Sequence, residues 1–286
     1  MTQALVSAPA LRARLDSGAA CLLLDCGFDL AEPDAGARAH AARHLPGAIY
    51  LNLDHDLSAP KTGANLGRGR HPLPTREAFL DRMAGLGLSD ELPVVAYDNA
   101  GGMFAARAWW MLRWIGHRAV QVLDGGLAAW DAAGGKLQSG AVAPRPPGLL
   151  SLRAMLTASV DFDTLRSGLG QGQRLIVDAR AADRFRGENE TLDPVSGHIP
   201  GAVNRSFKLN LGADGSFKPA ETLRADWLAL MAGRPASALV QQCGSGVTAC
   251  HNLLALEAAG LPGAALYPGS WSEWCAQAGA PVARGA

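Results

Sequence analysis

The chain has 286 residues and equal numbers of basic and acidic side chains, 26 Lys plus Arg and 26 Asp plus Glu. Because 48% of its residues are hydrophobic, global disorder is excluded, and the length predicts about two domains. The absence of a basic excess disfavours nucleic acids and anionic membranes as partners. We therefore expect partners that are small molecules or neutral protein surfaces.

The N-terminal segment and the cysteines predict a cellular compartment. No run approaches the ~18 apolar residues of a spanning helix. Residues 1–16 also lack the basic start and apolar core of an export signal. The five cysteines are too few, and odd in number, for a disulfide framework. We expect reduced thiols in a cytoplasmic protein.

Short apolar runs alternate along the chain with longer segments of helical period. In the first half, this pattern predicts strands at 21–25, 94–97 and 119–123, and helices at 76–84 and 105–115. In the second half, it predicts strands at 174–178, 238–242 and 264–267, and helices at 221–231 and 247–259. Apolar strands between amphipathic helices are typical of an α/β fold with a mostly parallel sheet covered on both faces.

Three phrases occur in the same order in both halves of the chain. The first is an apolar run that ends in Asp, within 21–26 and within 174–180. The second is a His-x-Pro-Gly-Ala phrase that begins at 44 and at 198. The third is the segment 99–130, which aligns without a gap with 243–274. This shared order indicates a duplicated unit. Between the copies, residues rich in Pro and Gly predict an extended linker. We expect domains at 1–140 and 155–286, joined by a linker at 141–154.

Cys243 is a candidate nucleophile because it directly follows a predicted strand. Gly244 and Gly246 leave room for backbone N–H groups to turn inward, and Val247 and Thr248 begin a helix whose N-terminus adds unpaired donors. Such a nest should favour the nucleophilic thiolate form of a cysteine. The alternative, a buried core cysteine, is the preferred interpretation of the other four cysteines. A phosphatase is disfavoured, because its arginine six residues after the cysteine is Ala249 here.

These duplicated phrases and the loop sequence CGSGVTA from Cys243 resemble the two-domain rhodanese superfamily of sulfurtransferases. The loop is similar to that of the 3-mercaptopyruvate sulfurtransferases, whereas thiosulfate-specific members carry basic residues after the cysteine. The resemblance implies that Cys243 takes sulfur from mercaptopyruvate as a persulfide, releases pyruvate and passes the sulfur to cyanide or a thiol, including that of a thioredoxin-like protein. It implies no metal or organic cofactor. Ser245 and His71 match a Ser–His relay beside the sulfur.

The resemblance also implies an anchor for the carboxylate of the donor. Arg184 matches a carboxylate-binding arginine, but Asp193 occupies the position of a second one. Arg186 is a candidate replacement, and Arg70, next to His71, is a further source of positive charge. With Gly244, Gly246, Val247 and Thr248, these arginines are the predicted substrate-binding residues.

The first copy has no cysteine at the position of Cys243. The ungapped alignment puts Asn99 there, and a shift of one residue puts Asp98 there; neither can carry a persulfide. We therefore expect one active site per chain, in the second domain. Two alternatives stay open: thiosulfate as the preferred donor, and a carrier module that accepts persulfide without fast turnover.

Overall fold

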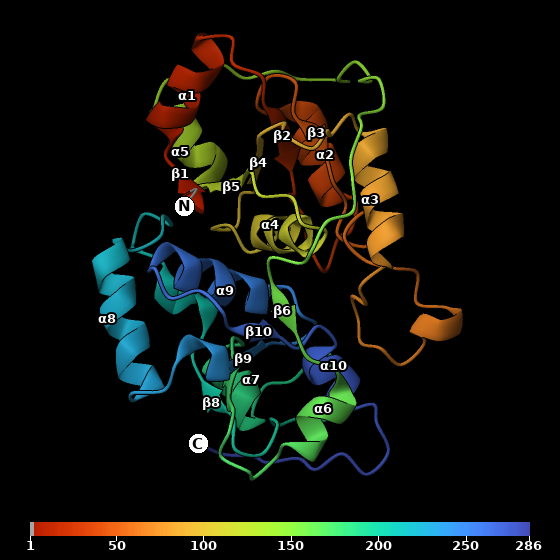
Figure 1. Cartoon of the computed structure of the whole chain (residues 1–286), viewed down its shortest axis with the longest axis vertical. Coiled ribbons are helices and arrows are strands. Elements are labelled where there is room, and N and C mark those ends of the chain that lie inside the picture. Colours follow the sequence, from red (N-terminus) through yellow and green to blue (C-terminus); the bar gives the residue numbers. More distant parts are fainter. Residues whose placement is uncertain (1–2) are drawn as a thin grey trace. The chain divides into compact units, whose positions relative to one another are not determined.

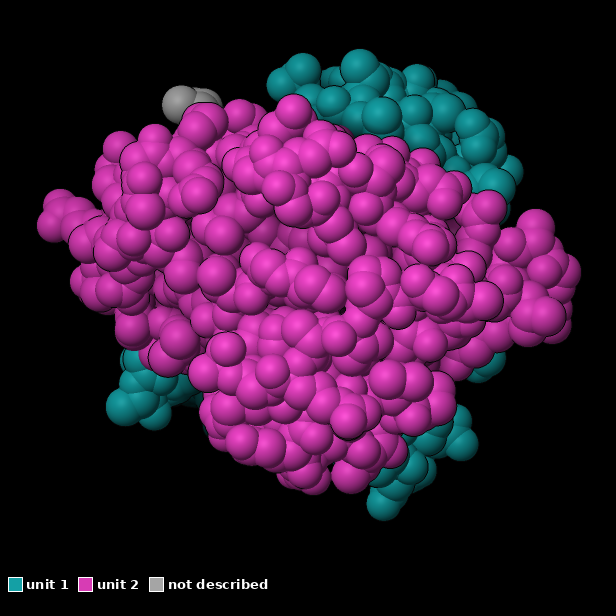
Figure 2. Space-filling model, turned by 90° about the horizontal axis from the view of Figure 1, so that it is seen from below, with its two compact units in different colours: residues 1–59, 74–156, 212–217 teal, residues 60–73, 157–211, 218–286 magenta. Residues whose placement is uncertain are grey.

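The computed structural model describes residues 3–286 and divides into two compact units. Unit 1 consists of Met1–Ala59, Pro74–Leu156 and Gly212–Phe217, and unit 2 consists of Pro60–Leu73, Thr157–Leu211 and Lys218–Ala286 (Figure 2). The segment Pro60–Leu73 thus belongs to unit 2, although it lies in the first half of the sequence. No helix among the described residues is long and apolar enough to cross a membrane.

Unit 1 contains a five-stranded parallel sheet with the spatial order β1-β5-β4-β2-β3. Its strands are β1 (Leu5–Val6), β2 (Leu22–Asp25), β3 (Ile49–Tyr50), β4 (Val94–Tyr97) and β5 (Val120–Leu123). Its helices are α1 (Ala8–Asp16), α2 (Ala35–Ala42), α3 (Arg76–Gly85), α4 (Ala105–Trp114) and α5 (Gly126–Ala132). The N-cap of α3 is Thr75, whose hydroxyl accepts the N–H of Ala78 at 3.1 Å.

Helices cover both faces of the unit 1 sheet. On one face, Leu23, Val95 and Leu123 pack with the neighbouring helices α1 and α5 (Figure 1). Because side chains alternate along a strand, the intervening buried residues point to the other face, where α4 contacts β4 and β5. Burial on both faces explains why these strands are mostly apolar rather than alternating.

Unit 2 repeats this plan with the strand order β6-β10-β9-β7-β8, again parallel. Its strands are β6 (Ala158–Ser159), β7 (Leu175–Asp178), β8 (Val203–Asn204), β9 (Leu239–Gln242) and β10 (Ala265–Leu266). Its helices are α6 (Phe162–Ser167), α7 (Ala182–Arg186), α8 (Ala220–Met231), α9 (Thr248–Ala258) and α10 (Ser270–Trp274). On one face, Ile176 and Val240 pack with Trp271 and Trp274 of α10, while α9 contacts β9 and β10 and lies beside α8 (Figure 1).

The predicted α/β class, with parallel sheets flanked by helices in two copies, is confirmed. The strand predicted at 94–97 is β4 itself, and the helix predicted at 247–259 is α9 shortened by one residue at each end. The elements that the pattern did not predict include the helices α1 and α2 and four strands of two residues each. Two residues are too few for a hydrophobic period to be recognised.

Candidate active site

The loop that carries Cys243 lies at the carboxyl end of β9, where open parallel sheets bind their ligands. Its backbone is attached to the start of α10. The N–H of Trp271 donates to the carbonyl of Cys243 at 3.0 Å, and the N–H of Ser272 donates to that of Gly244 at 2.9 Å. These bonds occupy the carbonyl groups of Cys243 and Gly244.

Gly246 and Ser270 give this loop its backbone shape. Gly246 has φ +75°, and a Cβ there would lie 2.2 Å from the carbonyl oxygen of Pro268, so only glycine fits. Ser270 has φ 53°, a conformation unusual for any residue with a side chain. Its hydroxyl accepts the N–H of Cys243 at 3.1 Å. The sequence did not single out Ser270; its signal is the ungapped alignment, which pairs Ser270 with Gly126 (φ +56°) of unit 1.

His71 and Ser245 form a buried pair, with 2.7 Å between Nδ1 of His71 and the hydroxyl oxygen of Ser245. Both belong to unit 2, because the segment before β4 that contains His71 packs with it. The N–H of Arg70, the preceding residue, donates to the hydroxyl of Ser272 on α10 at 2.9 Å. The structure thus brings His71 to the residue two positions after the candidate nucleophile.

Two guanidinium groups border Gly244, the residue after Cys243. A Cβ built on Gly244 would lie 3.0 Å from Nη2 of Arg70, and 3.6 and 3.7 Å from the terminal nitrogens of Arg184. The sequence suggested Arg186 as a replacement for the second carboxylate-binding arginine and Arg70 as a further source of positive charge. Arg70 is the one that reaches the loop, whereas Arg186 pairs with the exposed Glu188 at 2.6 Å.

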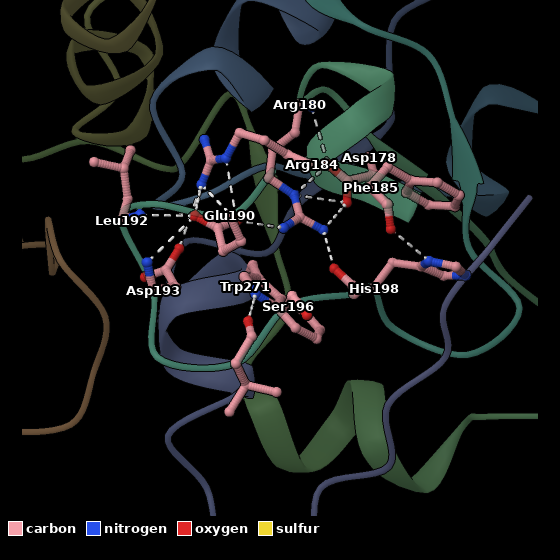
Figure 3. A network of polar contacts seen from close by, with 12 residues as sticks. Asp178, Arg180, Arg184, Phe185, Glu190, Leu192, Asp193, Ser196, His198 and Trp271 are labelled. Atoms are coloured by element: carbon pink, nitrogen blue, oxygen red, sulfur yellow. Dashed lines mark hydrogen bonds and ion pairs between the residues drawn. The ribbon is translucent and has the colours of Figure 1, made fainter. Parts of the chain in front are cut away.

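Carboxylates hold Arg70 and Arg184 in place, and Figure 3 shows the carboxylates around Arg180 and Arg184. Glu190 accepts from Arg184 at 2.8 Å, and also from the guanidinium of Arg180 at 3.3 Å. Asp193 accepts from Nη1 of Arg70 at 2.7 Å and lies 3.5 Å from Nη2 of Arg184. Arg180 also binds Asp178 at 2.7 Å. The network therefore contains three guanidinium groups and three carboxylates.

Burial and charge act on the pKa values of this network in opposite directions. Burial raises the pKa of Asp193, and the charge of Arg70 offsets this only in part. For Glu190, burial also works against the charged form, but hydrogen bonds from Arg184 and the N–H of Leu192 lower its pKa overall. Burial likewise disfavours the charge of Arg180, yet Asp178, Glu190 and Cys243 together raise its pKa. Cys243 thus lies within electrostatic reach of the network.

The surroundings of Cys243 are polar, although the residue is only 2% exposed. Val247 is the buried N-cap of α9, and Thr248 is its first residue, so their N–H groups are among those that a helix leaves unpaired. Cys250, one turn further on, is fully buried, and its thiol donates to the carbonyl of Gly246 at 3.2 Å. Low exposure keeps water from the sulfur, while the helix start supplies positive potential and the arginines supply N–H donors.

The corresponding loop of unit 1 contains a carboxylate where unit 2 has the cysteine. In unit 1, β2 pairs with β4 so that Asp25 lies beside Tyr97, and in unit 2, β7 pairs with β9 so that Asp178 lies beside Gln242. The next residues along β4 and β9 are therefore equivalent, and Asp98, not Asn99, corresponds to Cys243. The carboxylate of Asp98 accepts four backbone N–H bonds of 2.7–2.9 Å, from Ala100, Gly102, Phe104 and Ala105. This loop, between a strand and a helix, is therefore built to surround an anion.

Comparisons with known proteins identify the family of the chain. The model of the rhodanese-like domain matches residues 7–133 and 161–277. A probable 3-mercaptopyruvate sulfurtransferase of Pseudomonas aeruginosa is 49% identical over 98% of this chain and 98% of its own length. A putative thiosulfate sulfurtransferase of Mycobacterium tuberculosis is 38% identical, over 99% and 98%.

Solved structures give the same result. The 3-mercaptopyruvate sulfurtransferase from Leishmania major superposes with a TM-score of 0.83 at 32% identity, over 95% of this chain and 74% of that one. Together with the duplicated fold, these matches confirm the resemblance drawn from the sequence. The chain belongs to the rhodanese family, as a tandem of two rhodanese-like domains of which the second carries the candidate nucleophile.

Proposed function

We propose that the chain is a 3-mercaptopyruvate sulfurtransferase that carries sulfur as a persulfide on Cys243. The observation that carries the proposal is the position of Cys243 at the start of α9, next to a Gly244 that two arginines border. A nucleophilic sulfur and a binding site for a carboxylate then lie within the length of one small donor molecule. The relatives named for this activity support the choice of donor.

In the first half-reaction, the thiolate of Cys243 attacks the thiol sulfur of mercaptopyruvate. The new S–S bond forms as the bond between that sulfur and the donor's methylene carbon breaks. The electron pair of the broken bond moves onto the pyruvate fragment as an enolate. This enolate takes up the proton that the donor's thiol loses, so the products are pyruvate and a Cys243 persulfide anion.

The proton travels a short distance in this scheme, and Ser245 and His71 are suited to carry it. Their 2.7 Å contact lets the serine hydroxyl exchange a proton with the imidazole without a free water molecule. Arg184 and Arg70 bind the donor's carboxylate, since a guanidinium offers two parallel N–H donors to such a group. N–H groups of Gly244 to Thr248 surround the persulfide, as the unit 1 loop surrounds the Asp98 carboxylate.

In the second half-reaction, an acceptor attacks the outer sulfur of the persulfide and Cys243 leaves as a thiolate. Cyanide becomes thiocyanate, and a thiolate acceptor becomes a persulfide, so no external oxidant or reductant is consumed. A thioredoxin-like protein is a chemically suitable acceptor. The five cysteines are all free thiols, which supports a reducing compartment such as the cytoplasm.

Thiosulfate is the second candidate donor, because Arg70 and Arg184 border the loop and attract anions in general. The ratio of kcat/KM for the two donors decides between them, since that ratio measures specificity. A carrier module without turnover is the third candidate. It would release pyruvate slowly from mercaptopyruvate even with excess thiol acceptor.

The test is intact-mass spectrometry of the chain after incubation with mercaptopyruvate, with peptide mapping of any sulfur adduct. We expect a gain of one sulfur atom on the Cys243 peptide and stoichiometric pyruvate. Cys243→Ser should abolish both, whereas Cys250→Ser, a matched change in the adjacent helix, should retain the adduct. An adduct on another cysteine, or pyruvate release by Cys243→Ser, would contradict the proposal.

A further inference from the structure

Asp193 joins the two arginines that border Gly244. Its side chain is 4% exposed, with one oxygen 2.7 Å from Arg70 and the other 3.5 Å from Arg184. Glu190 also binds Arg184, whereas the carboxylate bonded to Arg70 is that of Asp193. The Arg70 guanidinium donates in addition to the carbonyl of Leu192 at 3.4 Å. The position of Arg70 beside the loop therefore depends on the segment that contains Asp193.

Gly244 is matched to this position of Arg70. Its backbone does not require glycine, since its φ is not in the left-handed region. A Cβ there would lie 3.0 Å from Nη2 of Arg70, so the guanidinium would have to shift by a few tenths of an ångström to make room. A longer side chain directly after Cys243 would compete with Arg70 for this space. Positive charge at the loop comes instead from a residue far away in the sequence, held by Asp193.

The charges around the loop are balanced. Arg70, Arg180 and Arg184 contribute three positive charges, and the carboxylates bonded to them, Asp178, Glu190 and Asp193, contribute three negative ones. An anionic donor thus meets directed N–H groups within a cluster of zero formal charge. Such a cluster binds a carboxylate by hydrogen bonds but adds little attraction for a second negative charge.

We propose that Asp193 is a positioning and specificity-determining residue, which holds Arg70 beside Gly244 and makes the site select sulfur donors with one negative charge over donors with two. This inference rests on the proposed function. Its physical basis is that Coulomb energy is proportional to the charge of the donor. Removing the negative charge of Asp193 stabilises a bound dianion by twice the free energy gained by a monoanion. The fold-change for the dianion is then the square of that for the monoanion.

The experiment measures kcat/KM for mercaptopyruvate, a monoanion, and for thiosulfate, a dianion. Asp193→Asn keeps an acceptor oxygen for Arg70 and removes the charge. We expect kcat/KM to rise about 3-fold for mercaptopyruvate and about 10-fold for thiosulfate, through KM rather than kcat. Asp193→Glu keeps the charge and should retain the wild-type ratio. The matched control is Glu188→Gln, which removes the same charge from the same segment at an exposed ion pair.

Arg70→Gln provides the reverse change and a second test if Asp193→Asn does not fold. It should lower kcat/KM more for thiosulfate than for mercaptopyruvate. The double variant Arg70→Gln, Asp193→Asn restores zero formal charge, so its donor ratio should return toward the wild-type value. A residue with only a structural role would lower both activities in parallel and give no such return.

The outcomes separate the two proposals. If the wild-type chain releases pyruvate and forms the Cys243 persulfide, but Asp193→Asn changes both donors equally or matches Glu188→Gln, the specificity role is wrong and the proposed function stands. If the wild-type chain forms no persulfide with either donor, both proposals fall. The specificity role is supported if the fold-change in kcat/KM for thiosulfate is the square of that for mercaptopyruvate in Asp193→Asn, and if the double variant shows no such difference.

Discussion

The hydroxyl of Ser270 accepts the backbone N–H of Cys243 at 3.1 Å and donates to the carbonyl of Tyr267 at 2.9 Å. Ser270 makes these bonds from a left-handed backbone conformation, φ 53°. This conformation costs a residue with a Cβ about 1 kcal/mol relative to glycine. Gly126 of unit 1 has nearly the same φ, 56°, without that cost. In unit 2, the residue with this strained backbone is also the one whose hydroxyl binds the amide of the candidate nucleophile.

Two substitutions of Ser270 separate the hydroxyl from the strain. Ser270→Ala keeps the strain and leaves the buried N–H of Cys243 without its acceptor, so the free energy of unfolding should fall by about 1–3 kcal/mol. Ser270→Gly also removes the acceptor but relieves the strain, so it should lose less stability. Because both release the same amide, both should lower kcat by a similar factor. Urea unfolding and pyruvate release measure the two effects.

The opposite ranking would remove this account of Ser270. If Ser270→Gly is less stable than Ser270→Ala, the left-handed conformation carries no strain. If both variants keep the wild-type kcat, the bond to the Cys243 amide does not position the nucleophile.

Substituting Asp98 should destabilise unit 1 and leave the sulfur chemistry of unit 2 intact. Burial raises the pKa of Asp98 even though four N–H bonds favour its charged form. In Asp98→Asn, one acceptor oxygen becomes an NH₂ group that faces N–H donors. With two N–H groups left unpaired, we expect unfolding to require about 3 kcal/mol less free energy. Thermal unfolding measures this loss, and the folded fraction should still form one persulfide per chain.

An alternative result for Asp98 would be informative. If folded Asp98→Asn forms less than one persulfide per chain, so that mixtures with the wild-type chain lose persulfide in proportion to the share of the variant, unit 1 takes part in the chemistry. A folded Asp98→Asn chain with unchanged stability would mean that the four N–H bonds are replaced by others.

Much of the fold follows from local sequence pattern. The strand β4 is buried on both faces and is an unbroken apolar run, whereas β9 is equally buried but ends in Gln241 and Gln242. The ends of both strands were predicted within one residue. The duplication was visible because the same backbone path needs glycine at matching places, such as Gly116 and Gly260, which follow α4 and α9 and both have positive φ. The segment Pro60–Leu73 was not predictable in this way, since its contacts with unit 2 involve residues about 200 positions away.

The candidate site was predicted less completely than the fold. Cys243 could be identified because strand, glycines and helix start are consecutive in the sequence. Asp193 was noted only as a missing arginine, because its role depends on the distant Arg70. Arg186 was an equally good candidate by sequence, and only the ion pair with Glu188 distinguishes it. Pairings between charged side chains leave no periodic signal, so sequence reasoning cannot assign them.

Truncating the arginines should distinguish their roles. Arg184→Ala removes a guanidinium at Gly244 and leaves Arg180 as the remaining guanidinium bonded to Glu190, so KM for mercaptopyruvate should rise at least about 10-fold. Arg70→Ala should raise KM by a similar factor. Arg186→Ala should change KM less than about 2-fold, since its exposed ion pair with Glu188 contributes little. Steady-state kinetics with mercaptopyruvate test all three.

If Arg186→Ala raises KM as much as Arg70→Ala does, Arg186 takes part in donor binding and the assignment of Arg70 as the second arginine is wrong. Equal losses for a donor that lacks a carboxylate would instead make Arg184 a structural residue. Circular dichroism spectra of the variants separate that case from global unfolding.

The ratio of the two donors should depend on pH through Asp193. Burial raises the pKa of this carboxyl, against the opposing charges of Arg70 and Arg184 and with a smaller contribution from Glu190. As the pH falls, Asp193 is therefore protonated at a higher pH than an ordinary aspartate, whose pKa is about 3.9. Protonation removes its negative charge, while the lowered pKa of Glu190 keeps that residue ionised.

The sign of the effect follows from this loss of charge. As the pH falls from about 7 toward the pKa of an ordinary aspartate, kcat/KM for thiosulfate should rise relative to that for mercaptopyruvate, because Asp193 loses its charge while thiosulfate remains a dianion and mercaptopyruvate a monoanion. Taking the ratio cancels the titration of groups common to both reactions, such as the nucleophile. In Asp193→Asn, the ratio should be high and independent of pH. A ratio that falls on acidification, or that has the same slope in Asp193→Asn, would exclude Asp193 as the titrating group.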